Sequence, residues 1–126
     1  MPIRRDETKW LRKKAKAGAG SFPVGTIAFY GPDDGRATKV AAVIERENHE
    51  PAALRRWTVD AGDVRRSQAV LAEVSAFFKA HGVRSVGMFD RIIGCPHEEG
   101  IDYPEGEVCP ACPFWVGRDR WSGEPF

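Results

Sequence analysis

The sequence predicts an α+β domain in which a small β-sheet carries one long helix and ends in a zinc-binding loop. Three observations support this fold class: β-rich segments in the first half, one apolar stripe at helical spacing, and a late cluster of cysteines with one histidine. A mixed α/β arrangement is the alternative. The chain has 126 residues, of which 42% are hydrophobic, so we expect one domain with its own core.

Residues 1–22 are predicted to form a basic, partly disordered arm, and residues 23–126 a single domain that includes the zinc site at 94–113. Within residues 1–16, seven Lys or Arg residues occur with only two acidic ones. We expect one or two helical turns near Trp10 before glycines interrupt them. The arm is either a solvated tail or a surface that binds nucleic-acid phosphates or an acidic partner. The residues that would make those contacts are Arg4, Arg5, Arg12, Lys13, Lys14 and Lys16.

Three β-rich segments follow the arm. Residues 24–30 and 39–46 are rich in β-branched and aromatic side chains, and the stretch GPDDG between them is a strong turn signal. These two segments are therefore predicted to pair as a hairpin. Residues 54–59 alternate only loosely and are predicted to form a third, short strand.

A long helix is predicted after Asp63, which is a candidate N-cap residue. The apolar stripe of this helix recurs at three- and four-residue steps until Gly82 stops it. Residues 83–89 then have the composition of a buried strand, which carries the chain directly toward Cys95. The stripe consists of Val64, Ser67, Val70, Leu71, Val74, Phe77, Phe78 and His81.

The three cysteines of the chain and one histidine are the feature that implies specific chemistry. They are arranged as Cys95-x-His97, an eleven-residue loop, and Cys109-x-x-Cys112. Three thiolates and one imidazole are the ligand set of a closed tetrahedral zinc site. Residues i and i+2 of an extended segment point to the same face, and a C-x-x-C turn brings both sulfurs to one side. The sequence therefore predicts that these four residues bind Zn²⁺.

Other uses of the same residues stay open at this point. Iron could replace zinc, and Cys109 with Cys112 could form a redox dithiol. A disulfide framework is disfavoured because the number of cysteines is odd. A structural ion is favoured over a catalytic one, because four protein ligands leave no position for water.

One catalytic alternative rests on the pattern H-x-E followed by C-x-x-C. This pattern is similar to the signature of the zinc nucleoside deaminases, and the resemblance implies a zinc-dependent hydrolase or deaminase with Glu99 as the proton shuttle. The chain departs from that signature in three ways. The loop between His97 and Cys109 is short, Val108 stands where the signature has a proline, and Cys95 would have to stay outside the coordination sphere.

The segment GCPHEEGIDYPEGEVCPACPFW resembles one found in small, uncharacterised bacterial zinc-binding proteins. The resemblance would cover roughly residues 24–121 of the chain. The resemblance implies one compact zinc-containing domain and no particular activity. We expect a binding or interaction protein, with a nucleic-acid binder and a zinc enzyme as the alternatives. The sequence contains no apolar run of membrane-spanning length, no export signal and no phosphate-binding glycine loop. A cytoplasmic protein without membrane contact or small-molecule cofactor is therefore predicted.

Overall fold

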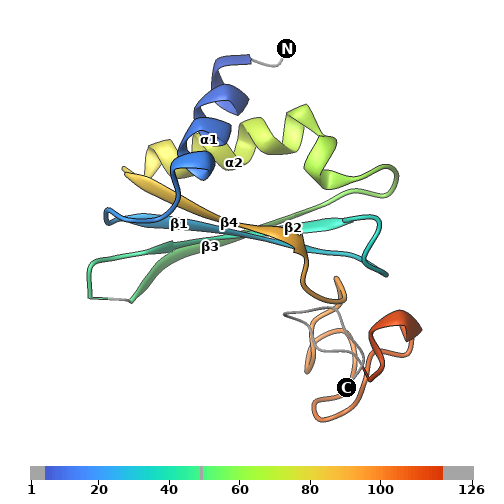
Figure 1. The fold of residues 1–126 in the computed structure, drawn as a ribbon. Coiled ribbons are helices and arrows are strands. Elements are labelled where there is room, and N and C mark those ends of the chain that lie inside the picture. The colour runs from blue at the N-terminus through green and yellow to red at the C-terminus, as the bar shows by residue number, and fades with distance from the viewer. Residues whose placement is uncertain (1–4, 49, 118–126) are drawn as a thin grey trace.

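A mixed four-stranded sheet with two helices on one face organises the structure (Figure 1). The computed structural model describes residues 5–48 and 50–117. The strand order is β3-β2-β1-β4, in which β1–β2 and β2–β3 are antiparallel and β1–β4 is parallel. This arrangement confirms the predicted α+β class. The elements are α1 (Arg5–Ala17), β1 (Val24–Tyr30), β2 (Lys39–Glu45), β3 (Pro51–Thr58), α2 (Gln68–Ala80) and β4 (Ser85–Ile92), with short 3-10 turns at Val64–Arg66 and Pro113–Trp115.

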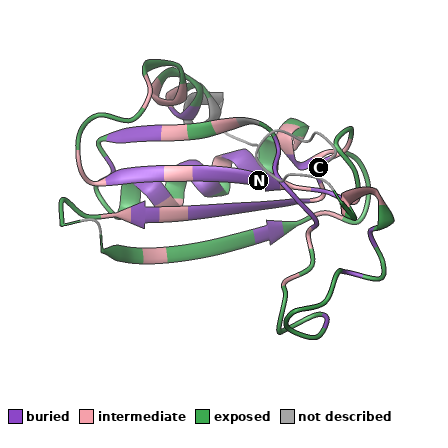
Figure 2. Ribbon diagram, turned by 60° about the horizontal axis from the view of Figure 1, so that its bottom comes forward, coloured by how far each residue is buried: buried purple, intermediate pink, exposed green. Residues whose placement is uncertain are grey.

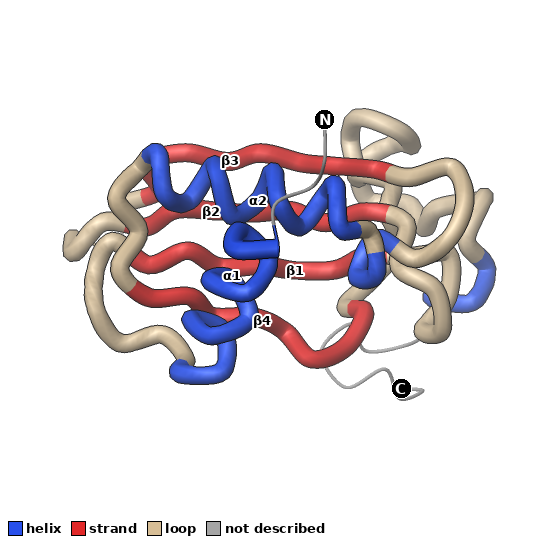
Figure 3. The backbone as a smooth tube through the Cα atoms, turned by 90° about the horizontal axis from the view of Figure 1, so that it is seen from above, coloured by secondary structure: helices blue, strands red, loops and turns tan. Residues whose placement is uncertain are grey.

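Helix α1 occupies the segment for which the sequence predicts a partly disordered arm. It is 13 residues long, and it packs against α2 and β4. Leu11 is only 1% exposed, and Trp10 and Ala15 pack against the same core. Packing of this apolar side stabilises a helix that would be marginal in isolation. Two helices therefore cover the sheet where the sequence predicts one (Figure 3).

Helix α2 begins later than the sequence predicts. Its N-cap is Ser67, whose Oγ accepts a hydrogen bond of 3.2 Å from the N–H of Val70. Asp63 instead caps the preceding 3-10 turn, and its carboxylate accepts a hydrogen bond of 2.6 Å from the Arg65 guanidinium. That hydrogen bond is the main cause that holds the pKa of Asp63 well below its ordinary value. Neither helix, nor any other helical stretch in the described part of the chain, has the length and apolar character needed to cross a membrane.

The core lies between the two helices and the sheet (Figure 2). Alternation along β1 points Ile27 and Phe29 toward the helices, and both are buried. Gly25 lies on the same side and allows a close approach of α2. A Cβ atom at this position would lie 2.7–2.8 Å from three atoms of the Phe78 ring, which is itself fully buried. The glycine is therefore required by packing between helix and sheet.

Among the described residues, no α-helix covers the opposite face of the sheet (Figure 1). Strand β4 leads from this sheet into the C-terminal segment, which we define as residues 94–117. Two backbone hydrogen bonds fix the exit point: Ile93 N–H donates to Phe29 O at 2.9 Å, and Gly31 N–H donates to Gly94 O at 2.9 Å. The C-terminal segment therefore starts from a defined position at the end of the sheet, on the side away from the helices.

Candidate metal centre

The C-terminal segment folds back on itself, so that the two halves of the Cys/His pattern meet. Cys95 and His97 follow β4 directly, and the pairing of β4 with β1 determines where they lie. Cys109 and Cys112 lie on the turn that leads into Pro113–Trp115. The residues predicted as ligands are thus brought together from both ends of one loop.

Local hydrogen bonds shape the loop between the two half-sites. The Asp102 carboxylate accepts a hydrogen bond of 2.7 Å from Glu98 N–H, and Gly100 N–H donates to Tyr103 O at 2.8 Å. Gly100 and Gly106 have φ angles of 82° and 86°, a region that residues with a Cβ rarely adopt. These two glycines let the chain reverse within the short space between the half-sites.

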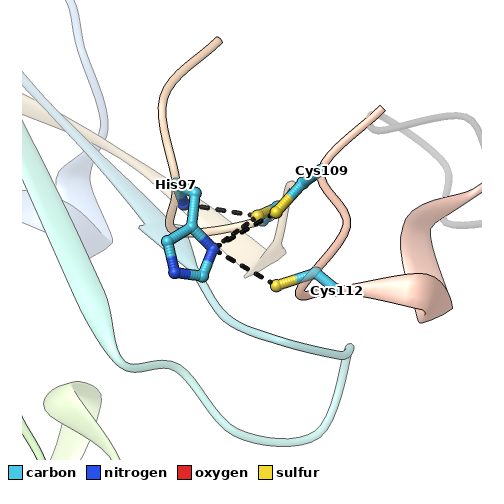
Figure 4. Close-up of side chains that lie close together, drawn as sticks. His97, Cys109 and Cys112 are labelled. Carbon is cyan, nitrogen blue, oxygen red and sulfur yellow. Dashed lines mark hydrogen bonds between the residues drawn. The ribbon is translucent and has the colours of Figure 1, made fainter. Parts of the chain in front are cut away.

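The sulfurs of the three cysteines surround Nδ1 of His97, and Figure 4 shows the side chains of Cys109 and Cys112 pointing toward it. This nitrogen lies 3.2 Å from Sγ of Cys95, 3.4 Å from Sγ of Cys109 and 3.5 Å from Sγ of Cys112. All four atoms lie within 4.8 Å of one another. Tetrahedral bonds of about 2.3 Å to sulfur and about 2.0 Å to nitrogen would separate the two kinds of ligand by roughly 3.5 Å. The cluster therefore has the size of a tetrahedral metal site and can hold a metal ion.

Backbone amides point at two of the sulfurs. The N–H of His97 donates to Sγ of Cys95 at 3.3 Å, and the amides of Ala111 and Cys112 donate to the sulfur of Cys109. Burial raises the pKa of the Cys109 thiol, but these amides and the neighbouring thiols lower the pKa by more, so the net shift is downward. Burial is the main cause that raises the pKa of both Cys95 and Cys112. A bound cation would supply the positive charge that three adjacent thiolates require.

The thiols form a small core of their own, separate from the main one. Cys95 and Cys109 are each 9% exposed and Cys112 is 2% exposed. Tyr103 is buried among them, and Trp115 packs against the cluster. Water therefore has little access to the sulfurs, as in metal sites that stabilise a fold.

Side chains tie this small core to the sheet. The Nζ of Lys39 donates a hydrogen bond of 2.9 Å to Pro96 O and lies 3.5 Å from the Glu98 carboxylate. Arg56 of β3 forms an ion pair of 2.8 Å with the same carboxylate. On the other side, Nε1 of Trp115 donates a hydrogen bond of 2.8 Å to the backbone oxygen of Gly31. Strands β2 and β3 and the β1–β2 connection thus all contact the C-terminal segment.

A hollow of about 290 Å³ adjoins the metal centre on the helix-free face. Val43 and Leu54, from β2 and β3, line it from the sheet, whereas Cys95, His97 and Glu98 line it from the C-terminal segment. Leu54 is 48% exposed and provides an apolar surface at the rim of the hollow. The wall nearest the cluster therefore depends on the conformation of the metal-ligand loop.

The carboxylates that the deaminase alternative needs have other partners. Glu98 is held by Lys39 and Arg56, and Oε2 of Glu99 accepts a hydrogen bond of 3.3 Å from Gly106 N–H. Cys95 lies inside the cluster, whereas that alternative requires it to stay outside. The geometry favours four protein ligands over three ligands and a water.

Sequence reasoning missed the supporting residues of the site. Lys39 was part of a predicted strand, and Arg56 part of another, with no signal in either that they would meet Glu98. The aromatic composition of the run after Cys112 is a signal for packing on the domain, and Trp115 packs against the cysteine cluster and hydrogen-bonds to Gly31 O. The predicted basic contact residues lie elsewhere: Arg12, Lys13, Lys14 and Lys16 are on α1, Arg5 begins α1, and Arg4 lies outside the described residues.

Comparisons of the chain with models of protein families, with curated proteins and with solved structures found no match in any of the three. The function is therefore inferred from the geometry of the site itself.

Proposed function

We propose that this protein is a small zinc-binding domain in which a structural Cys3His site holds the C-terminal segment against the sheet, and that it acts by binding a partner. The observation that carries the proposal is the convergence of the ligand atoms of Cys95, His97, Cys109 and Cys112 within 4.8 Å. A cytoplasmic location remains our expectation, since reduced thiols at a metal site suit a reducing compartment.

The donor set supports zinc as the metal. Thiolate and imidazole ligands suit Zn²⁺, whereas Mg²⁺ and Ca²⁺ prefer oxygen ligands. Iron–sulfur clusters are usually held by four cysteines, and this chain has three in total. Zn²⁺ is therefore the metal that best matches three sulfurs and one nitrogen in a tetrahedral arrangement.

The surroundings of the cluster support a structural role. The regular structure of the C-terminal segment consists of one 3-10 turn and one isolated bridge between Glu99 and Tyr103. Its small core offers little apolar area apart from Tyr103 and Trp115. A segment of this kind needs cross-linking to be stable, and a bound metal supplies it because site formation and folding are coupled.

The hollow supports a binding role. It opens on a sheet face that no described helix covers, and its volume is close to the lower limit for ligand sites. The exposed side chain of Leu54 and the ion-paired Arg56 provide an apolar and a charged contact at its rim. Zinc would maintain this surface, because three residues of the ligand loop form one wall of it.

The structural role is tested by measuring metal content and then amide hydrogen exchange with and without a chelator. We expect one zinc ion per chain, and loss of protection across residues 94–117 after zinc is removed. His97→Asn should lose the metal, while the matched variant His81→Asn should retain it, because His81 caps α2 with its ring bonded to Phe77 O. Unchanged protection and an unchanged melting temperature in the zinc-free protein would rule out the structural role.

A further inference from the structure

We propose that the exposed face of α1 binds the phosphate backbone of duplex nucleic acid without reading its sequence. Four cations form this face: Lys9, Arg12, Lys13 and Lys16, which are all exposed. They are spaced at i, i+3, i+4 and i+7, so they lie on one side of the helix. Leu11, which is 1% exposed, anchors the opposite side to the core. We call this set the basic stripe.

No ion pair joins a cation of the basic stripe to any side chain that the structure describes, a set that leaves out the side chains of residues 5–8 and of Asp90. Three arginines elsewhere do form ion pairs: Arg55 with Glu73, Arg56 with Glu98 and Arg65 with Asp63. The stripe thus gathers four exposed cations on one side of a helix, whereas the charge of each of these three arginines is offset by a carboxylate. Unpaired, solvent-exposed cations can exchange their counterions for phosphates at little cost.

The exposed basic group in the structure differs in membership from the group predicted from the sequence. Lys14, which the sequence placed with the other arm residues, donates a hydrogen bond of 3.1 Å from Nζ to the backbone oxygen of Arg84. It thus points toward β4 and helps to fix α1, whereas Lys9 joins the exposed group. Lys79 lies over the ring of Trp10 at 5.2 Å and adds a further positive charge beside the helix.

The four cations of the basic stripe lie on a helix that is packed against the domain, and they span a length comparable to several phosphates of a duplex. From Lys9 to Lys16 the helix rises roughly 10 Å. Duplex DNA carries one charge per about 1.7 Å of its axis with both strands counted, so an equal length of duplex carries about six phosphates, of which the four cations can contact those on the near side. Because α1 packs on α2 and β4, the side chains need less ordering on binding than those of a flexible tail would.

The uneven distribution of charge favours one orientation of the protein toward a polyanion. Residues 94–117 contain five acidic residues and no Lys or Arg. Figure 1 shows this C-terminal segment and α1 on opposite sides of the sheet. The net charge of +1 therefore conceals a positive helix side and a negative metal-site side. A polyanion is attracted to α1 and repelled by the opposite side.

Duplex is favoured over single-stranded nucleic acid. Single strands bind through stacking of bases on exposed aromatic rings in addition to charge. Trp10 is the aromatic residue of α1, and it is partly buried against the core with Lys79 over its ring. The basic stripe therefore offers charge without a stacking surface.

The test is fluorescence anisotropy with the full chain and a labelled duplex DNA of about 20 base pairs, across about 25 to about 200 mM NaCl. With four phosphate contacts, a plot of log K against log salt should have a slope of about −3.6. Lys13→Gln should reduce the magnitude of that slope by about one. Arg46→Gln removes another exposed positive charge, from the β2–β3 connection, and should leave the slope unchanged.

Any of three outcomes would overturn the proposal. The first is undetectable binding at the lowest salt, and the second is an equal effect of Lys13→Gln and Arg46→Gln. The third is tighter binding of a single strand or of a poly-glutamate peptide than of the duplex, which would identify a different partner. Circular dichroism of each variant checks that α1 stays folded, and because each substitution lies on the exposed face, folding should be retained.

Discussion

Lys39 of β2 donates a hydrogen bond of 2.9 Å to the backbone oxygen of Pro96, the residue between the first two candidate ligands. Its side chain comes from the sheet, yet the residue is only 7% exposed, because the C-terminal segment covers it. A buried ammonium group is costly unless it is paired. Here it is paired with Pro96 O and Glu98, and it lies beside a site that would carry a net negative charge with three thiolates around Zn²⁺.

Replacing Lys39 with methionine should therefore weaken both the fold and the metal site. The variant keeps most of the aliphatic stem but leaves Pro96 O and Glu98 without this partner. We expect a loss of about 1–3 kcal/mol in the free energy of unfolding and faster zinc loss to a competing chelator. Lys16→Met, at an exposed position of α1, serves as the control and should change stability by about 0.5 kcal/mol or less. Equal effects of the two variants would show that Lys39 does not tether the ligand loop.

Trp115 provides the second attachment of the C-terminal segment. Trp115→Phe keeps an aromatic ring against the thiol core but removes the hydrogen bond of 2.8 Å to Gly31 O. We expect a loss of about 1 kcal/mol in urea denaturation. Val116→Ala alters the exposed neighbour and should stay within about 0.5 kcal/mol of the parent protein. A Trp115→Phe variant as stable as the parent would mean that this hydrogen bond contributes nothing to docking of the segment.

Gly25 tests how closely α2 packs on the sheet. In Gly25→Ala the new methyl group would lie 2.7–2.8 Å from the Phe78 ring, so strand or helix must shift. We expect a loss of about 1–3 kcal/mol. The matched variant is Gly87→Ala on the neighbouring strand, where the nearest atom would be Ala19 Cβ at an ordinary 3.5 Å, and stability should hardly change.

A second substitution that relieves the clash between a methyl group at position 25 and the Phe78 ring checks the same contact independently. Adding Phe78→Leu to Gly25→Ala removes ring atoms where the methyl group arrives, so the double variant should lose less stability than the sum of the two single variants. Additive losses would indicate that the two residues are not in contact.

The sequence was sufficient for features that depend on neighbours along the chain. The hairpin follows from β-rich segments around GPDDG, and the four candidate ligands follow from the spacing of Cys95, His97, Cys109 and Cys112. The predicted start of α2 after Asp63 is wrong, because Asp63 and Ser67 are both good N-cap residues and only Ser67 caps the helix. The structure uses both, one for a 3-10 turn and one for the helix.

Features that depend on distant contacts were not predictable. Lys39 begins a strand, where a lysine is normally solvated, and its burial results from a loop more than fifty residues later. Helix α1 contains few apolar residues among many lysines, so its local pattern resembles a solvated tail. Only contact with α2 and β4 explains why Leu11 is buried and why the lysines divide into an exposed stripe and a tether.

Zinc K-edge X-ray absorption on the purified protein tests the Cys3His assignment most directly. The account predicts three sulfur atoms at about 2.3 Å and one nitrogen at about 2.0 Å around a single zinc ion, with no oxygen ligand. A spectrum with only two sulfurs, or with a light oxygen ligand in addition to the histidine, would contradict a closed structural site and would reopen the catalytic alternative.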